Sequence, residues 1–143
     1  MQIPQYINVQ IEKLSEEGNQ SFDINSFADA IRKWNSALDV LPPPRFDWEA
    51  WTWLNASIGD AYYQLGNFEA ARQALFDALN GPGGLDNPFV QFRLGQCSLC
   101  LRRDEEAVDH LLRAYMLDGE QIFSADQNGA RALNLLRERG LVR

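Results

Sequence analysis

The feature that most constrains this chain is a sequence pattern that returns after 36 residues. Gly59 and Gly95 stand at equivalent places in the pattern, 36 positions apart. The same interval separates three further pairs of residues: Ala71 and Ala107, Leu75 and Leu111, Ala78 and Ala114. A period of about 20–50 residues is typical of proteins in which one supersecondary unit is copied and stacked. The chain is therefore predicted to fold as an array of similar units.

An earlier and looser copy precedes these two. Gly18, Ala30, Trp34 and Ala37 fit the same frame, and the alanines precede those of the second copy by 41 residues. The extra length lies in residues 42–47, which begin with three prolines. Small residues let two helices pack near the lower end of the usual spacing of about 8–10 Å. We therefore expect each copy to be a helix pair whose first helix carries a glycine at the point of closest approach.

Residues that begin and end helices support this division. Gly66 ends a helix, residues 81–84 (Gly-Pro-Gly-Gly) separate the second and third copies, and Asn87 before Pro88 is typical of a helix start. Asp126 is predicted to cap a last helix that Gly140 closes. The predicted fold is a single all-α domain over residues 1–143, with helical hairpins at about 5–41, 48–80 and 88–118. They would form a right-handed superhelix with a capping helix at about 126–139.

Charge and composition restrict the partners. Of 143 residues 45% are hydrophobic and 23% charged, which is typical of a globular chain, and the net charge is -7. Such a surface repels nucleic acid and anionic membranes and attracts basic proteins, although acidity can also serve only solubility. No apolar run approaches the length of a membrane span, and no secretory signal is evident, so we expect a cytoplasmic protein. The sequence allows a homo-oligomer but does not indicate one.

The residues that would make an enzyme or a metal site are missing from the pattern. His110 is the single histidine, no nucleophile is patterned near it, and the glycine-rich residues 81–84 lack the lysine of a phosphate loop. Cys97 and Cys100 have a zinc-like spacing, but zinc needs four ligands. We expect both cysteines to be small, buried, reduced core residues. The sequence predicts no catalytic residue, no metal and no cofactor.

The residues of the second copy resemble the tetratricopeptide repeat (TPR) family. Residues 55–83 carry the family's small and aromatic positions as Gly59, Tyr62, Gly66, Phe68, Ala71, Leu75 and Ala78. The third copy departs from that pattern with Ser98 in place of the aromatic residue and Arg102 in place of the turn glycine. The resemblance implies stacked helical hairpins that bind other proteins, but it does not specify which protein.

A narrower resemblance concerns several short phrases, among them residues 48–50, 58–62, 87–89, 93–96 and 114–123. Together they are similar to small bacterial repeat proteins that are encoded beside polymorphic or secreted toxins and are thought to be immunity proteins. Residues 125–129 depart from that pattern. The resemblance implies a protein that binds and neutralises a cognate, possibly basic, toxin or effector. The alternative is a general adaptor or secretion chaperone that holds a peptide segment.

The first helix of each hairpin faces the groove in this family, and residues three or four apart on it would line that groove. The predicted groove residues are Asn19, Phe22, Trp53, Ala56, Asp60, Tyr63, Phe89, Phe92, Arg93 and Gln96. Asp60 and Arg93 would be its charged anchors, while Phe89 and Phe92 could instead pack against the neighbouring repeat. Only two of the five residues of the family's carboxylate clamp are matched, by Asn19 and Arg93. Ser15, Ser57 and Phe89 occupy the other places, so we do not expect an acidic peptide.

Overall fold

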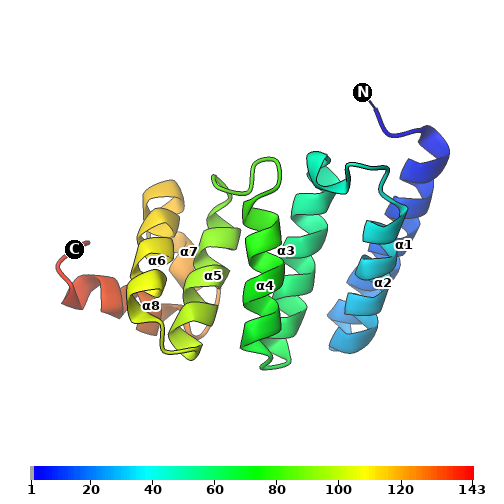
Figure 1. Ribbon diagram of the computed structural model, residues 1–143. Helices are drawn as coiled ribbons and strands as arrows, with labels where there is room; N and C mark the ends of the chain where they lie inside the picture. The colour runs from blue at the N-terminus through cyan, green and yellow to red at the C-terminus, as the bar shows by residue number, and fades with distance from the viewer. Residues whose placement is uncertain (1) are drawn as a thin grey trace. The chain divides into compact units, whose positions relative to one another are not determined.

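The protein is described by a computed structural model over residues 2–143, a range that contains α-helices and no β-strand. The predicted all-α fold of helical hairpins is confirmed. Helices group into two compact units, unit 1 up to Gly84 and unit 2 from Leu85 to Arg143. In unit 1 they are α1 (Gln5–Asp23), α2 (Phe27–Val40), the 3-10 helix η1 (Arg45–Asp47), α3 (Glu49–Gln64) and α4 (Phe68–Leu79). Figure 1 labels the four α-helices of unit 1 together with α5 (Pro88–Cys100), α6 (Asp104–Asp118), α7 (Gln121–Ser124) and α8 (Gly129–Glu138) of unit 2.

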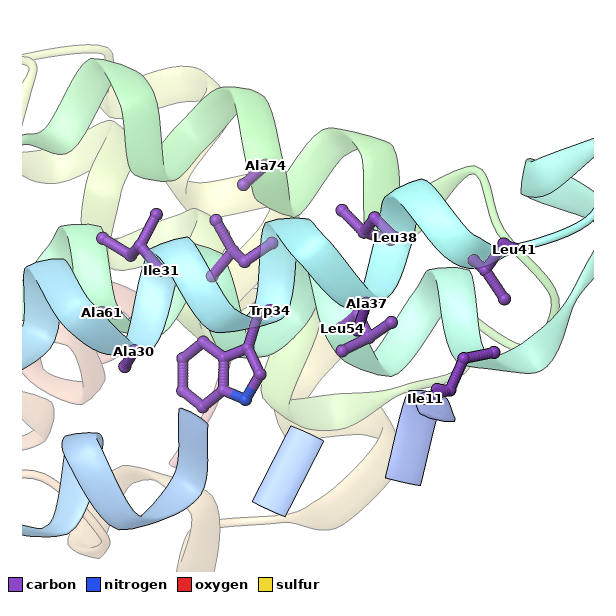
Figure 2. Close-up of a cluster of buried hydrophobic side chains, with 11 residues drawn as sticks. Ile11, Ala30, Ile31, Trp34, Ala37, Leu38, Leu41, Leu54, Ala61 and Ala74 are labelled. Carbon is purple, nitrogen blue, oxygen red and sulfur yellow. The ribbon is translucent and has the colours of Figure 1, made fainter. Parts of the chain in front are cut away.

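Unit 1 consists of two helix pairs joined through α2 and α3. Helix α1 packs against α2, α2 against α3, and α3 against α4. Its core includes Ile11, Ile31, Trp34, Leu38, Leu41, Leu54 and Ile58, each at most 6% exposed. Figure 2 shows Trp34 directed from α2 toward α1, where its indole Nε1 donates to the Ser15 carbonyl oxygen at 3.2 Å. The large side chain at this position thus both fills the space between the helices and fixes their relative position.

The repeated glycines lie where the two helices of each pair come closest, as the sequence predicts. A Cβ atom added to Gly59 would lie 2.5 Å from Cγ of Leu75, and one added to Gly18 would lie 2.3 Å from Nε1 of Trp34. In unit 2 a Cβ atom at Gly95 would lie 2.5 Å from Leu111. Such separations are far shorter than ordinary carbon contacts of about 3.5–4.0 Å, so no larger residue fits without displacing its neighbour.

Unit 2 contains a third helix pair, α5 and α6, which is covered by the two short helices that follow. Phe123 of α7 is 2% exposed and packs edge-on against Phe92 of α5, with ring centroids 5.2 Å apart. The prediction that Asp126 caps the last helix is wrong, because α8 begins at Gly129. The Asp126 carboxylate instead accepts hydrogen bonds from the Asn128 backbone N–H at 2.7 Å and from Arg93 at 2.7 Å.

No helix within residues 2–143 combines the length and the apolar character that crossing a bilayer requires.

The glycine contact leads to a stability prediction for unit 1. We expect Gly59→Ala to lower the free energy of unfolding by about 1–3 kcal/mol through overpacking, although alanine is the better helix former. Leu75→Ala alone should cost about 2–5 kcal/mol by leaving a cavity. The double variant should cost clearly less than the two single losses added together, because shortening Leu75 makes room for the new methyl group. All four tryptophans lie in unit 1, so urea unfolding followed by tryptophan fluorescence measures this unit; additive losses would contradict the contact.

Candidate protein-binding surface

The candidate surface is the side of unit 1 formed by the first helix of each pair, α1 and α3. Helix α3 buries Leu54, Ile58 and Ala61 in the core. Trp53 and Asp60 are seven residues apart, so they project from one face of that helix, about two turns from each other. On α1, Asn19 and Phe22 lie on the side that approaches α3, because all of Asn19, Phe22 and Asp60 line one hollow. Three of the predicted groove residues, Asn19, Phe22 and Asp60, thus lie together in unit 1, and their role in binding stays a prediction.

We call this first depression the acidic hollow. It has a volume of about 170 Å³ and is lined by Asn19, Phe22, Asp23, Trp34, Ser57 and Asp60. The Phe22 ring is half-buried and lies 5.1 Å from the ring of Phe27 and 5.9 Å from that of Trp34. Asp60 accepts a hydrogen bond from the Gln64 side chain at 3.3 Å. Two carboxylates thus lie beside two aromatic rings that packing holds in place.

A second depression, the tryptophan hollow, lies at the other ends of the same two helices. It has a volume of about 720 Å³ and is lined by Gln2, Ile3, Pro4, Gln5, Asn8, Trp48, Glu49, Ala50 and Trp53. The indole N–H groups of Trp34, Trp48 and Trp51 each donate to a backbone carbonyl. Trp53 is 44% exposed, and its indole forms no such hydrogen bond within residues 2–143. Its ring and its N–H group are therefore both accessible to a partner.

Two further predicted groove residues of α3 contribute little open surface. Ala56 is only 8% exposed. Tyr63 is half-buried, and its ring packs edge-on against Phe68 of α4 with centroids 5.7 Å apart. Both side chains are already in contact with unit 1 itself.

The predicted groove residues of α5 lie largely in the interior of unit 2. Phe92 is 1%, Arg93 6% and Gln96 3% exposed. Arg93 Nη1 lies 2.7 Å from an Asp126 carboxylate oxygen and 2.6 Å from Gln96 Oε1, and its guanidinium also lies over the half-buried Phe89 ring at 5.1 Å. The sequence missed this arrangement because Asp126 is 33 positions away and reaches Arg93 only through the α7–α8 segment. The face of α5 is thus covered by the chain's own residues.

Opposing effects act on the Asp126 carboxyl group. Burial by itself raises its pKa, but the hydrogen bonds from Arg93 and from the Asn128 N–H, together with the Arg93 charge, outweigh burial and hold the pKa below its ordinary value. Because the ionised carboxylate is the form that pairs with Arg93, folding of unit 2 favours deprotonation of Asp126.

The candidate catalytic groups have structural roles or lack the required environment. His110 Nδ1 lies 2.8 Å from the side-chain oxygen of the buried Gln91, a contact that fixes a histidine between two helices. Cys97 is buried as expected, but the prediction for Cys100 is wrong, because it is exposed at the last position of α5. Partial desolvation raises the pKa of the Cys100 thiol, against the lowering effect of Arg131, so this thiol is not activated. Within residues 2–143 no cluster of histidine, cysteine or carboxylate side chains could hold a metal ion.

Several residues of the two hollows were not among the predicted groove residues. Asp23 follows Asn19 by four positions and Ser57 precedes Asp60 by three, so helical periodicity could have added both. Trp34 belongs to α2, and Gln2, Ile3 and Pro4 precede the first predicted hairpin, so no periodic signal pointed to them.

Comparison with known proteins identifies the fold. The sequence matches no family model and no curated protein. The structure matches the Arabidopsis OM64 TPR domain with a TM-score of 0.71 and 18% identity, over 91% of this chain and 96% of that one. It matches the first TPR of Spaghetti (RPAP3), bound to the HSP90 peptide SRMEEVD, with a TM-score of 0.71 and 19% identity over 93% and 94% of the two chains. It also matches the C-terminal TPR-containing domain of a Plasmodium falciparum FK506-binding protein, with a TM-score of 0.74 and 19% identity over 91% of this chain and 87% of that one.

These similarities show that the chain has the fold of tetratricopeptide-repeat domains. At 18–19% identity they carry the fold alone.

The Arg93–Asp126 pair leads to a pH prediction for unit 2. Folding lowers the pKa of Asp126, so the ionised carboxylate stabilises unit 2. This stabilisation is complete above the unfolded pKa of about 3.9 and is lost as the pH falls through the lower pKa of the folded state. We expect Asp126→Asn to destabilise α7 and α8 at pH 7 by about 3 kcal/mol, because Arg93 is left buried without its carboxylate. The difference in stability between this variant and the unsubstituted chain should become smaller at acidic pH.

Hydrogen exchange of the α7 and α8 amides measures this effect in unit 2 directly. The matched control is Glu105→Gln, which removes the carboxylate of another pair between helices, Glu105–Arg139, in which the Glu105 side chain is 83% exposed. Its effect should stay below about 1 kcal/mol, as for other exposed pairs. Equal losses in the two variants would contradict the role given to Arg93 and Asp126.

Proposed function

We propose that this protein is a non-catalytic binding module that holds a polypeptide segment of another protein against the α1 and α3 side of unit 1. The observation that carries the proposal is Trp53, a large aromatic side chain left 44% exposed beside a hollow of about 720 Å³. Tryptophan is among the residues that contribute most binding energy in protein interfaces, because it offers a wide apolar face and a hydrogen-bond donor. The acidic hollow on the same two helices offers a second contact point.

The fold supports a protein partner. One similar solved structure, the first TPR of Spaghetti (RPAP3), is bound to a peptide. That peptide, SRMEEVD, is rich in acidic residues, whereas the hollow on α1 and α3 contains Asp23 and Asp60. We therefore propose the same general mode of binding with a different, non-acidic class of partner.

The finer proposal is that the partner is a bacterial toxin or effector and that the protein acts in the cytoplasm as its immunity protein. Support comes from the short sequence phrases shared with such proteins and from the net charge of -7, which favours association with a basic partner. Bound along α1 and α3, the toxin would be held away from its substrate. The alternative is an adaptor or secretion chaperone, for which the same surface would hold a segment of its client.

A pair of aromatic substitutions tests the binding surface. We expect Trp53→Ala to weaken partner binding at least about tenfold, because it removes an exposed anchor at the edge of the tryptophan hollow. The matched control is Phe46→Ala in η1, whose side chain is 59% exposed and lines neither hollow. The partner is first isolated from the native host with the unsubstituted chain, and affinities are then measured by calorimetry with purified proteins. Unchanged helical circular dichroism should accompany the loss, and equal affinities for both variants would place the interface elsewhere.

Co-expression tests the immunity proposal. The product of a gene adjacent to that of this protein should arrest growth when expressed alone, and this protein should restore growth. Trp53→Ala should restore it less well than Phe46→Ala, since rescue depends on binding. A set of neighbouring gene products without toxicity would contradict the immunity role and leave the adaptor alternative.

A further inference from the structure

The tryptophan hollow combines two indole rings with a rim of neutral polar groups. Trp48 is half-buried and packs on the core of unit 1, so its ring is held in place, whereas Trp53 is 44% exposed. The amide side chains of Gln2 and Gln5 are exposed in the same lining. The volume of about 720 Å³ lies within the roughly 300–1,000 Å³ of sites that enclose a whole ligand. The hollow therefore has room for several residues of a bound segment.

The hydrogen-bonding groups of the two indoles suit a segment that offers carbonyl oxygens. Trp48 Nε1 donates to the carbonyl oxygen of Pro42 at 2.7 Å, so one indole of this hollow already holds a proline of the chain itself. The indole N–H group of Trp53 is accessible and also needs an acceptor when a partner covers it. Proline has a carbonyl oxygen but no N–H group. A proline-rich segment can thus supply that acceptor without burying unpaired N–H groups of its own.

The other common ways of binding a peptide lack their requirements in this hollow. Addition of a β-strand needs the edge of a sheet, and the part of the chain that the structure describes contains no strand. An amphipathic helix needs a continuous apolar groove, whereas the amides of Gln2, Gln5 and Asn8 interrupt this lining. An acidic or phosphorylated segment needs a cluster of arginines, and no basic side chain among the described residues lines the hollow. Proline-rich segments, in contrast, bind to surfaces lined by aromatic rings.

Charge favours a segment that also carries a basic residue. Among the described lining residues the exposed Glu49 is the one with a charged side chain. Residues 1–84 contain 11 acidic and 5 basic side chains, so the surrounding unit is negatively charged as well. A lysine or arginine beside the prolines would be attracted to this carboxylate. The attraction is moderate, because Glu49 lies in the first turn of α3, at the positive end of the helix dipole.

The spacing of the two indoles fits the repeat of a polyproline II helix. That helix repeats every three residues, which is about 9 Å along its axis. Trp48 and Trp53 are five positions apart, which corresponds to about 7.5 Å along α3. One turn of the segment can therefore place a proline on each ring.

We propose, building on the function proposed above, that the tryptophan hollow receives a proline-rich segment of the partner in the polyproline II conformation. Prolines three positions apart pack on Trp48 and Trp53, and a carbonyl oxygen of the segment accepts a hydrogen bond from Trp53 Nε1. A lysine or arginine beside the prolines pairs with Glu49. Because such a segment is already extended before it binds, little conformational entropy is lost on binding.

The test is a selection from a library of randomised displayed peptides on the full, unsubstituted chain. Enriched peptides should share two prolines three positions apart and a neighbouring basic residue. Their affinity should fall at least about tenfold on Trp53→Ala. Trp53→Phe keeps an aromatic ring without the N–H group, so it should cost less, about two- to fivefold.

A matched pair of charge variants tests the basic residue. Glu49→Gln should lower the affinity about two- to fivefold, since exposed ion pairs contribute little. The control is Glu16→Gln, which removes one negative charge from an exposed side chain of α1 that lines neither hollow, and it should change the affinity less than about twofold.

Nitrogen-15 NMR of the tryptophan indoles tests the hydrogen bond directly. The indole N–H groups of Trp34, Trp48 and Trp51 already donate to backbone carbonyls of unit 1. On addition of an enriched peptide, the N–H signal that is missing from the Trp53→Phe spectrum should therefore move most. A Trp53 signal that stays in place would overturn the proposed contact.

The outcomes separate this inference from the proposed function. Enriched peptides without shared prolines, whose binding is lost on Trp53→Ala, would overturn the proline-rich occupant and leave a protein-binding surface. Equal affinities of the Glu49→Gln and Glu16→Gln variants would overturn the pairing of a basic residue with Glu49. A selection that enriches no peptide would contradict the proposed function, and the proline-rich occupant with it.

Discussion

The close approach of a glycine on one helix to a large side chain on the next is the interaction on which the rest of the structure depends. Gly18 with Trp34, Gly59 with Leu75 and Gly95 with Leu111 bring the helices of each pair within reach of one another. The alanines on the second helices are fully buried as well: Ala30, Ala37, Ala71, Ala78, Ala107 and Ala114. These contacts occupy one side of the first helix in each pair, and α3 also packs against α2, so only part of its surface is left for another use.

The two units use that remaining side differently. In unit 2 the face of α5 is covered by Phe123 and by Asp126, which pairs with the buried Arg93. In unit 1 the corresponding side of α1 and α3 keeps two hollows and an exposed Trp53. A covered face stabilises its own unit, whereas an uncovered face with an aromatic anchor is available to another polypeptide.

Local patterns predicted most of the fold. The spacing of glycines and alanines predicted the helix pairs. Asn87 caps α5 as expected, because its side chain accepts hydrogen bonds from the N–H groups of Phe89 and Val90. Periodicity also brought Asn19, Phe22 and Asp60 to one hollow. It could not show that Arg93 is buried, because that depends on how residues 121–128 pack over α5, nor that Cys100 is exposed at a helix end. A repeat pattern does not predict contacts between segments that are far apart in the sequence.

The most direct test of an open α1 and α3 face is photo-cross-linking in the native host. A photoreactive phenylalanine analogue replaces Trp53 in one variant and, as a comparison, Met116 of α6, which is 76% exposed, in another. The account predicts that the analogue at position 53 links the chain to a segment of another protein, and that position 116 does not link to that segment. Cross-links from position 53 only to this chain's own residues, or capture of the partner only from position 116, would contradict it.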